Sequence, residues 1–325
     1  MRKFLSCDWG TTSFRLRLVE TERLTIIEEE NTKQGIAETF QKWKQSQGNE
    51  ETRLGFYLDI IAKHIKAIEE RSAGSLDDVP LIISGMASST VGMVDLPYKN
   101  LPFSATGEDL EIFTIDQSAI VKNKVLIISG VRTKDDVIRG EETKLVGCAA
   151  VSSRDDIYIF PGTHPKYVEV KDGRAIAFKT YMTGEFFELL SQKSILSVSV
   201  KKGESLQAEN NFQSFAAGVN EGINSNILHS SFLVRTNDVF KKYSLEENYF
   251  YLSGLLLGTE LKDLIEGKRN LIIVGNEALT AQYLAALKVL GLPGQGIEAQ
   301  IIDADKALIA GQWQVYKNKF PDKDQ

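Results

Sequence analysis

The chain has 325 residues, a net charge of −6 and an apolar fraction of 42%. These values predict a globular protein with two domains, because a single hydrophobic core rarely grows to this length. The sequence has no cluster of Lys and Arg, which argues against nucleic acid as a partner. No apolar run approaches a membrane span, and the first one ends at Asp8, too early for a signal peptide. We therefore expect a cytoplasmic protein that binds no membrane.

The N-terminal stretch has the pattern of a strand, a tight turn and a second strand. Residues 2–7 are extended and largely apolar, and residues 14–18 alternate apolar and basic side chains. Asp8 ends the first strand, and residues 10–13 offer a glycine, three hydroxyls and a series of backbone N–H groups. A carboxylate beside such donors suits a phosphate tail with its Mg²⁺. An ordinary hairpin turn has the same composition, so both interpretations stay open here.

The rest of the chain alternates buried strands and helices. We expect strands at 24–30, 80–86, 125–130, 156–160, 167–170, 175–178, 270–276 and 298–302. We expect helices at 52–71, 141–151, 184–192, within 214–264, and at 278–290 and 304–316. The series strand, phosphate-type turn, strand, turn, strand occurs at the start and again from Ile157, which indicates two related halves.

Strands that end in Gly or Ser turns and are followed by helices indicate α/β layers. Two such halves place a ligand crevice at the carboxyl ends of their strands. We therefore expect an N-terminal domain over residues 1–150, which contains a loop for the substrate, and a C-terminal domain over residues 151–325. Two cysteines, Cys7 and Cys148, are expected to be buried thiols.

Seven stretches, taken in order, resemble the 2-dehydro-3-deoxygalactonokinase (2-keto-3-deoxygalactonate kinase) family of the actin-like ATPase and sugar-kinase superfamily. They are residues 8–13 (DWGTTS), 129–133 (SGVRT), 139–143 (RGEET), 161–164 (PGTH), 178–185 (FKTYMTGE), 252–258 (LSGLLLG) and 274–276 (VGN). The resemblance implies an α/β fold of two ribonuclease H-like (actin-like ATPase) domains with a ligand cleft between them. It also implies ATP- and Mg²⁺-dependent phosphorylation of the 6-hydroxyl of 2-dehydro-3-deoxy-D-galactonate, a step of galactonate catabolism.

The sequence departs from the family pattern in two places. The family has Val-Gly-Ser-Arg-Gln-Gly-Trp after the position of Met86, whereas residues 87–93 here read Ala-Ser-Ser-Thr-Val-Gly-Met. An Arg and a Trp of a substrate loop are therefore missing, which bears on the identity of the substrate more than on the reaction. Pro165 and Tyr167 replace a Ser and a Trp after the second phosphate-type turn, which looks tolerable.

Phosphoryl transfer needs groups that bind the phosphates, a metal ion and an acceptor for the hydroxyl proton. Asp8 is the expected metal-shell carboxylate. The phosphate-binding residues are expected to be Gly10, Thr11 and Thr12 from the first half and Gly162, Thr163 and His164 from the second. Gly275 and Asn276 resemble the turn that binds adenosine in the family. A histidine that only satisfies turn backbone groups, and a plain turn before a helix, are the alternatives for His164 and for residues 275–276.

Two adjacent glutamates are the candidates for the catalytic base. The run Glu142-Thr143-Lys144-Leu145 resembles the Glu-Ala-Arg-Leu run of related exopolyphosphatases, whose glutamate acts near the γ-phosphate. We therefore favour Glu142 as the base and place Glu141 second. The alternative is that either carboxylate merely suits the positive N-terminus of its helix.

The acidic substrate requires a group that binds its carboxylate, for which a planar guanidinium is suited. Arg132, in the turn after a buried strand, is the best candidate, and Arg15 is the second. Four further residues are candidates for contact with substrate hydroxyls: Ser88, Ser89, Lys166 and Glu185. A solvated or capping role would explain each of these four equally well.

Two other functions fit the same pattern. The first is another enzyme of the fold, either a kinase of a different keto-sugar acid or a phosphohydrolase. The second is a non-catalytic relative, a sugar-sensing or polymerising ATPase. The expected partners are a small sugar acid and ATP, and the sequence leaves a homo-oligomer open.

Overall fold

The computed structural model describes residues 2–46, 48–72, 74–149, 156–264, 269–292 and 299–321. The chain divides into two compact units. The first consists of Met1–Asp155, Glu169–Phe178 and Ala304–Gln325, and the second of Asp156–Val168 and Lys179–Asp303. This division differs from the expected assignment of residues 151–325 to one domain, because the C-terminal helix packs in the first unit.

The first unit is built on a six-stranded sheet. Its strands, in spatial order, are β3 (Ile26–Thr32), β2 (Phe14–Glu20), β1 (Lys3–Trp9), β4 (Leu81–Gly85), β8 (Val125–Ile128) and β7 (Ile112–Ile115). Strands β1, β4 and β8 are parallel, whereas β2, β3 and β7 pair antiparallel with their neighbours. Because side chains alternate along a strand, Leu5, Cys7 and Trp9 share one face of β1, and Phe4, Ser6 and Asp8 share the other.

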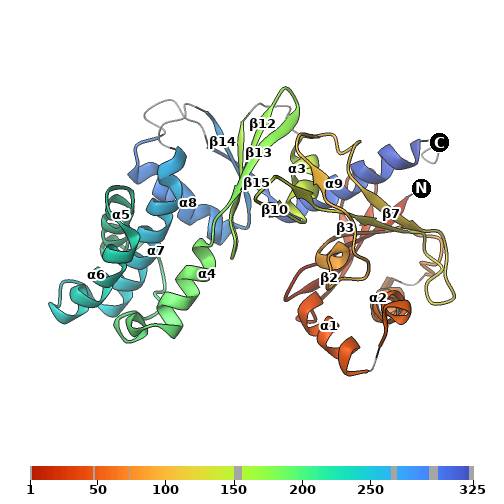
Figure 1. Ribbon diagram of the computed structural model, residues 1–325, viewed down its shortest axis with the longest axis horizontal. Coiled ribbons are helices and arrows are strands. Elements are labelled where there is room, and N and C mark those ends of the chain that lie inside the picture. The colour runs from red at the N-terminus through yellow and green to blue at the C-terminus, as the bar shows by residue number, and fades with distance from the viewer. Residues whose placement is uncertain are drawn as a thin grey trace. The chain divides into compact units, whose positions relative to one another are not determined.

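Helices cover both faces of this sheet, as Figure 1 shows. They are α1 (Ile36–Gln45) and α2 (Glu50–Ser72) on one face, and α3 (Glu141–Ala149) and α9 (Ala304–Lys319) on the other. Leu5, Cys7 and Trp9 belong to the core cluster that includes the apolar side chains of α2. On the other face, the ring of Phe4 stacks on Trp313 of α9 with 5.1 Å between ring centroids. The last helix of the chain therefore anchors the first strand.

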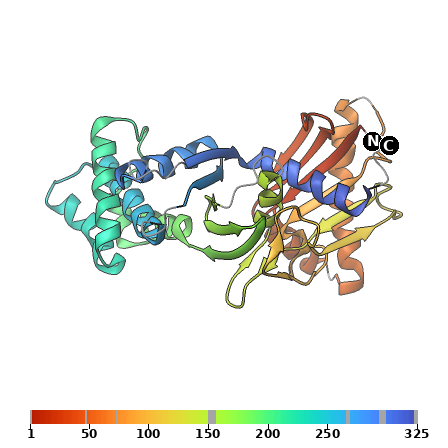
Figure 2. The same ribbon diagram turned by 90° about the horizontal axis from the view of Figure 1, so that it is seen from above.

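Helices α3 and α9 lie side by side at close range (Figure 2). A Cβ atom added to Gly311 of α9 would overlap the carbonyl of Thr143, and one added to Gly147 of α3 would overlap the carbonyl of Ala307. These two glycines therefore let the backbones of α3 and α9 approach each other closely. Ala150 and Val151, the expected end of this helix, lie outside the described residues.

Short elements complete the first unit. They are η1 (Met86–Ser88), β5 (Lys99–Asn100), β6 (Phe103–Ser104), β9 (Val131–Arg132) and β10 (Val137–Ile138). The 3₁₀ helix η1 directly follows β4. Strands β10, β9 and β5 form a three-stranded sheet, and β6 pairs with the part of β13 that belongs to the first unit.

The second unit combines parallel strands with a group of helices. Its strands are β11 (Ile157–Phe160), β14 (Leu271–Gly275) and β15 (Ala299–Asp303), together with parts of the hairpin β12 (Lys166–Lys171) and β13 (Arg174–Thr180). Strand β14 pairs in parallel with both β11 and β15. In the spatial order of the sheet, β11 lies between β14 and β12, and β12 lies next to β13. Glu298, the expected start of the last strand, lies outside the described residues.

The helices of the second unit are α4 (Thr183–Glu188), η2 (Leu189–Lys193), η3 (Ile195–Ser199), α5 (Glu209–Asn224), α6 (Ile227–Val239), α7 (Leu245–Leu261), η4 (Lys262–Leu264) and α8 (Glu277–Val289). The helical region predicted over 214–264 is thus three helices. In the described ranges, every helix is too short or too polar to cross a lipid bilayer. Cys7 and Cys148, both in the first unit, are free and buried, as predicted.

Candidate functional site

The turn after β1 presents exposed backbone on the first unit. Gly10 N–H donates to the carbonyl of Ser13 at 2.9 Å, which closes the turn. The carbonyls of Gly10 and Thr11 accept hydrogen bonds from the first amides of α1. Thr11 and Thr12 are exposed, and in the described part of the chain their own amides have no hydrogen-bond acceptor. Hydrogen bonds within the turn and to α1 thus hold its backbone, while Thr11 and Thr12 stay exposed to solvent.

Asp8 lies beside Gly85, and Gly85 in turn lies close to Gly140. Gly85 ends β4 at φ +90°, and a Cβ atom there would lie 3.4 Å from Asp8 Oδ1. Gly140 has φ +103°, and a Cβ atom there would lie 3.5 Å from Gly85 Cα. A positive φ at both positions is the conformation that glycine adopts without strain. The fold therefore brings the predicted metal carboxylate close to the loop that precedes the acidic pair.

Glu142 is fully buried at the N-terminus of α3. Its carboxylate accepts hydrogen bonds from the amide of Gly140 at 2.9 and 2.7 Å and from the hydroxyl of Thr143 at 3.0 Å. Burial, with a smaller contribution from the charge of Glu141, raises the pKa of Glu142 to about 7. Glu141 is half-buried and accepts a hydrogen bond from the amide of Arg139 at 3.2 Å.

Arg139 connects the acidic pair to the loop after β4, and the sequence predictions do not include it as a site residue. Its Nη1 donates to the carbonyl of Ser88 and, at 2.6 Å, to the Ser88 hydroxyl. Its guanidinium lies 4.2 Å from the ring centroid of Tyr98, a cation–π distance. Ser88 and Ser89 are both buried, and the Ser89 hydroxyl donates to the carbonyl of Met86 at 2.7 Å. The sequence pattern that could have indicated Arg139 is an arginine directly before a glycine and two acidic residues at the start of a helix.

The two arginines predicted to bind the substrate carboxylate differ in their surroundings. Arg15 Nη1 forms a 2.7 Å ion pair with Asp305, which also pairs with Arg17. Arg132 is exposed, and its Nε donates to Asn100 Oδ1 at 2.8 Å. The side chain of Arg132 lines a cavity of about 540 Å³ within the first unit. The other lining residues are Asn100, Leu101, Thr133, Lys134, Ile176, Ala177 and Phe178.

In the second unit, three predicted residues form one cluster after β11. His164 Nε2 lies 2.5 Å from Glu185 Oε2, and Lys166 Nζ donates to the carbonyl of His164 at 2.6 Å. The amide of Glu185 donates to the carbonyl of Thr163 at 3.1 Å. Because Gly184 touches the backbone of residues 162–163, the start of α4 supports this turn.

A pocket of about 190 Å³ adjoins this turn within the second unit. It is lined by Gly162, Pro165, Thr183, Gly184, Phe187, Tyr249, Ser253, Leu256, Leu257, Leu279, Gln282 and Tyr283. The pocket thus lies between the turn after β11 and helices α7 and α8. Asn276 is the N-cap of α8, where its Oδ1 accepts a hydrogen bond from the amide of Leu279 at 3.0 Å. Gly275 directly precedes this cap.

A buried carboxylate next to this pocket escaped the sequence predictions. Glu260 of α7 is 2% exposed, and its Oε1 accepts hydrogen bonds from the hydroxyls of Tyr167 and Tyr283, both at 2.6 Å. Burial raises the pKa of Glu260. The three residues join β12, α7 and α8. The sequence pattern that could have indicated Glu260 is a single acidic residue within the apolar C-terminal part of α7, Leu255–Leu261.

The model of one protein family, 2-keto-3-deoxy-galactonokinase, matches residues 8–315. The 2-dehydro-3-deoxygalactonokinase of Escherichia coli (strain K12) is 29% identical over 301 residues, which are 89% of this chain and 90% of that protein. A solved structure from Sinorhizobium meliloti, described as a candidate 2-dehydro-3-deoxygalactonokinase, is 26% identical with a TM-score of 0.78 and covers 98% of this chain and 99% of that one.

A more distant structure shares the fold. The activator of 2-hydroxyisocaproyl-CoA dehydratase from Clostridium difficile, solved with bound ADPNP, has a TM-score of 0.51 at 12% identity and covers 99% of this chain and 98% of that one. The expected fold class, the α/β fold of actin-like ATPases and sugar kinases, is confirmed.

Proposed function

Because the chain belongs to the 2-keto-3-deoxy-galactonokinase family, we propose that it transfers the γ-phosphoryl group of ATP to the 6-hydroxyl of 2-dehydro-3-deoxy-D-galactonate. The observation that carries this proposal is the family match over residues 8–315, which spans both units. Phosphoryl transfer to a sugar acid needs hydrogen-bond donors that bind the phosphates, a base, and a group that binds the substrate carboxylate. The described residues supply amides and hydroxyls for the phosphates, a carboxylate of raised pKa as the base, and a guanidinium for the substrate.

The phosphates are assigned to the two turns. The exposed amides and hydroxyls of Thr11 and Thr12 would bind phosphate oxygens from the first unit, and the turn Gly162–His164 would do so from the second. That both turns bind the same triphosphate stays a prediction. Glu185 and Lys166 hold the backbone and ring of His164, so we assign them to support of the turn.

Magnesium would be held mainly by phosphate oxygens and water. The described residues contain no group of three or more His, Cys, Asp and Glu that could ligate a metal by itself. A single carboxylate, Asp8, fits an ion that keeps several waters and is completed by the phosphates. When bound, the ion would neutralise charge on the transferred group.

The nucleoside is assigned to the pocket of the second unit. Its aromatic and aliphatic walls suit a flat base, and Ser253 and Gln282 provide polar groups for its edge. The pocket reaches Gly162, so a base bound there would direct its phosphates to the turn after β11. Asn276 caps α8 with its carbonyl oxygen, which leaves its amide N–H₂ as the group for the ribose.

Glu142 is the proposed base, with Glu141 second. A carboxylate with a pKa of about 7 can accept a proton near neutral pH and pass it on, which is the condition for efficient general base catalysis. Its hydrogen bonds to Gly140 and Thr143 fix its orientation. Because the side chain is fully buried, the role requires the turn at Gly140 to open toward the bound substrate.

The carboxylate of the substrate is assigned to Arg132, which lines the 540 Å³ cavity together with Lys134. Arg15 is assigned to structure, since Asp305 already neutralises it. Ser88 and Ser89 are buried and hold the loop after β4, with Arg139 fastened to Ser88.

A coupled assay of ATP consumption over a panel of sugar acids tests the function. We expect turnover with 2-dehydro-3-deoxy-D-galactonate and a product phosphorylated on O6, which phosphorus and carbon NMR would identify. Higher turnover with another keto-sugar acid would assign a different kinase, and phosphate release without any sugar would assign a phosphohydrolase. ATP-dependent pelleting without transfer would assign a polymerising ATPase.

A further inference from the structure

Glu260 continues the face of α7 that lines the pocket of the second unit. Ser253, Leu256 and Leu257 of this helix line the pocket. Glu260 follows them after seven, four and three residues, so it lies on the same face of the helix, about one turn beyond Leu256 and Leu257. Its side chain is buried and does not line the pocket in the described part of the chain. Glu260 therefore lies behind the pocket wall.

Two residues of the pocket wall adjoin the Glu260 carboxylate. The Tyr283 hydroxyl donates to Oε1 at 2.6 Å, and the Thr183 hydroxyl is close enough to lower the pKa of Glu260. Both residues line the pocket. Tyr167, which lies in the core, donates to the same oxygen at 2.6 Å, and its ring packs on Tyr181 with 4.8 Å between centroids. One buried oxygen thus ties a side chain of the pocket wall to the core behind it.

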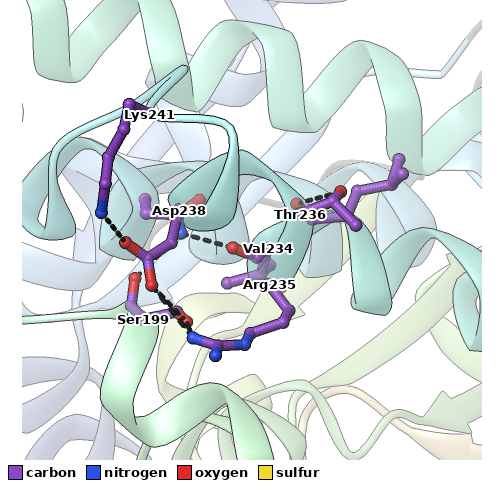
Figure 3. Close-up of polar contacts among 8 residues, drawn as sticks. Ser199, Val234, Arg235, Thr236, Asp238 and Lys241 are labelled. Atoms are coloured by element: carbon purple, nitrogen blue, oxygen red, sulfur yellow. Dashed lines mark hydrogen bonds and ion pairs between the residues drawn. The ribbon is translucent and has the colours of Figure 1, made fainter.

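A buried carboxylate without a cation is an unfavourable way to hold two tyrosines. Asp238, another carboxylate of the second unit, pairs with Arg235 at 3.1 Å and with Lys241 at 3.3 Å (Figure 3). The polar neighbours of Glu260 among the described residues are hydroxyls, and its Oε2 is buried there without a hydrogen-bond partner. Apolar residues of similar size can often replace such buried groups without loss of stability. Stability alone therefore does not explain why a carboxylate lies here.

We propose that Glu260 is a positioning residue for nucleotide binding, which holds the Tyr283 ring in the orientation that forms the pocket wall. The proposal rests on the assignment of the nucleoside to this pocket. A tyrosine with an anchored hydroxyl is held against rotation into or out of the pocket, so the nucleotide does not have to order the ring when it binds. Loss of the anchor should therefore weaken nucleotide binding, although Glu260 itself does not touch the nucleotide.

A matched pair of tyrosine variants tests the proposal. Tyr283→Phe and Tyr167→Phe each remove one 2.6 Å hydrogen bond to the same oxygen, and of the two only Tyr283 lines the pocket. In calorimetric titrations with ADP, the Kd of Tyr283→Phe should rise roughly 3–10-fold, as for one lost hydrogen bond, and that of Tyr167→Phe should stay within about twofold of the wild type. The KM for ATP should rise with the Kd, and the KM for the sugar acid should not. Equal Kd values for the two variants would overturn the proposal.

Removal of the whole polar group separates positioning from stability. The triple variant Glu260→Met/Tyr167→Phe/Tyr283→Phe lacks all three buried polar groups, so it should melt near the wild-type temperature. Its Kd for ADP should nevertheless stay raised roughly 3–10-fold, whereas Glu260→Gln, whose oxygen can still accept both hydroxyls, should bind within about twofold of the wild type. A stable triple variant that binds ADP as tightly as the wild type would mean that Glu260 only supports the core, and would overturn the proposal.

The ADP titration also separates this proposal from the proposed function, because it needs no turnover. A wild type that binds ADP, together with the expected loss in Tyr283→Phe, would support the role of Glu260 even if no sugar acid were phosphorylated. That absence of phosphorylation would refute the kinase assignment alone. A wild type that binds no ADP would overturn the role of Glu260.

Discussion

Replacement of Glu142 by Gln should raise stability and lower activity at the same pH. The folded protein holds the pKa of Glu142 near 7, against about 4.5 for an ordinary glutamate. A raised pKa means that the folded state favours the protonated form, so stability is greatest at low pH and is lost as pH rises from about 4.5 through 7. Between about pH 5 and about pH 8 this loss amounts to roughly 2–3 kcal/mol of the free energy of unfolding.

Glutamine has the same shape, stays neutral and can still accept the hydrogen bond of Gly140. Glu142→Gln should therefore match the wild type at about pH 5 and exceed it by roughly 2–3 kcal/mol at about pH 8. If Glu142 is the base, kcat should fall by roughly 10²–10⁴-fold while the variant is more stable. Urea unfolding at several pH values and the coupled assay measure the two quantities.

The control is Glu277→Gln, which replaces an exposed glutamate in the first turn of α8 and should leave the pH dependence of unfolding as in the wild type. Glu141→Gln removes the smaller of the two causes that raise the pKa of Glu142 and should reduce the pH dependence in part. The reasoning is refuted if Glu142→Gln is less stable than the wild type at about pH 8. That result would mean that Glu142 only caps its helix, since a charged cap at a helix N-terminus is stabilising.

Three further changes probe the supports of the site. Gly311→Ala should destabilise the protein by roughly 1–3 kcal/mol, because the new methyl overlaps the carbonyl of Thr143; a thermal melt would show it, and an unchanged midpoint would contradict the close packing of α3 on α9. Glu260→Leu should cost roughly 2–5 kcal/mol, since it leaves two buried tyrosine hydroxyls without an acceptor, whereas Glu260→Gln should retain most of the stability. Asn276→Ser keeps the cap of α8, so a raised KM for ATP with an unchanged melting temperature would assign the amide of Asn276 to the nucleotide; an unchanged KM would leave it as a cap alone.

The elements around the site could be predicted because their signals are local. The strand that ends at Asp8, the strand that ends at Gly85 and the helix that starts at Glu141 each have an apolar run followed by a glycine or an acid, and each is observed within a few residues. Helix α1 was not predicted, since only Ile36, Phe40 and Trp43 are large and apolar among its ten residues. Its first amides are instead held by the carbonyls of the turn after β1.

The contacts that complete the site could not be predicted, because they join residues far apart in the chain. Gln312 donates to the carbonyl of Cys7 at 2.9 Å and to the Ser84 hydroxyl at 2.8 Å, 305 and 228 residues away. No periodicity in the sequence relates these positions. The same holds for Glu260, whose tyrosine partners come from a strand and a helix on either side of it in the chain.

Helix α6 illustrates a different limit of sequence patterns. The spacing of Leu228, Phe232 and Val239 is typical of a face that packs in a core, yet the structure turns this face outward and fills the inner one with Ser230, Val234 and Asn237. Periodicity predicts that an apolar face will be covered and cannot say whether the cover comes from the same chain. For α6, the polar inner face is satisfied by bonds such as Asn237 Nδ2 to Asn248 Oδ1 at 3.5 Å, so the helix does not need to rotate.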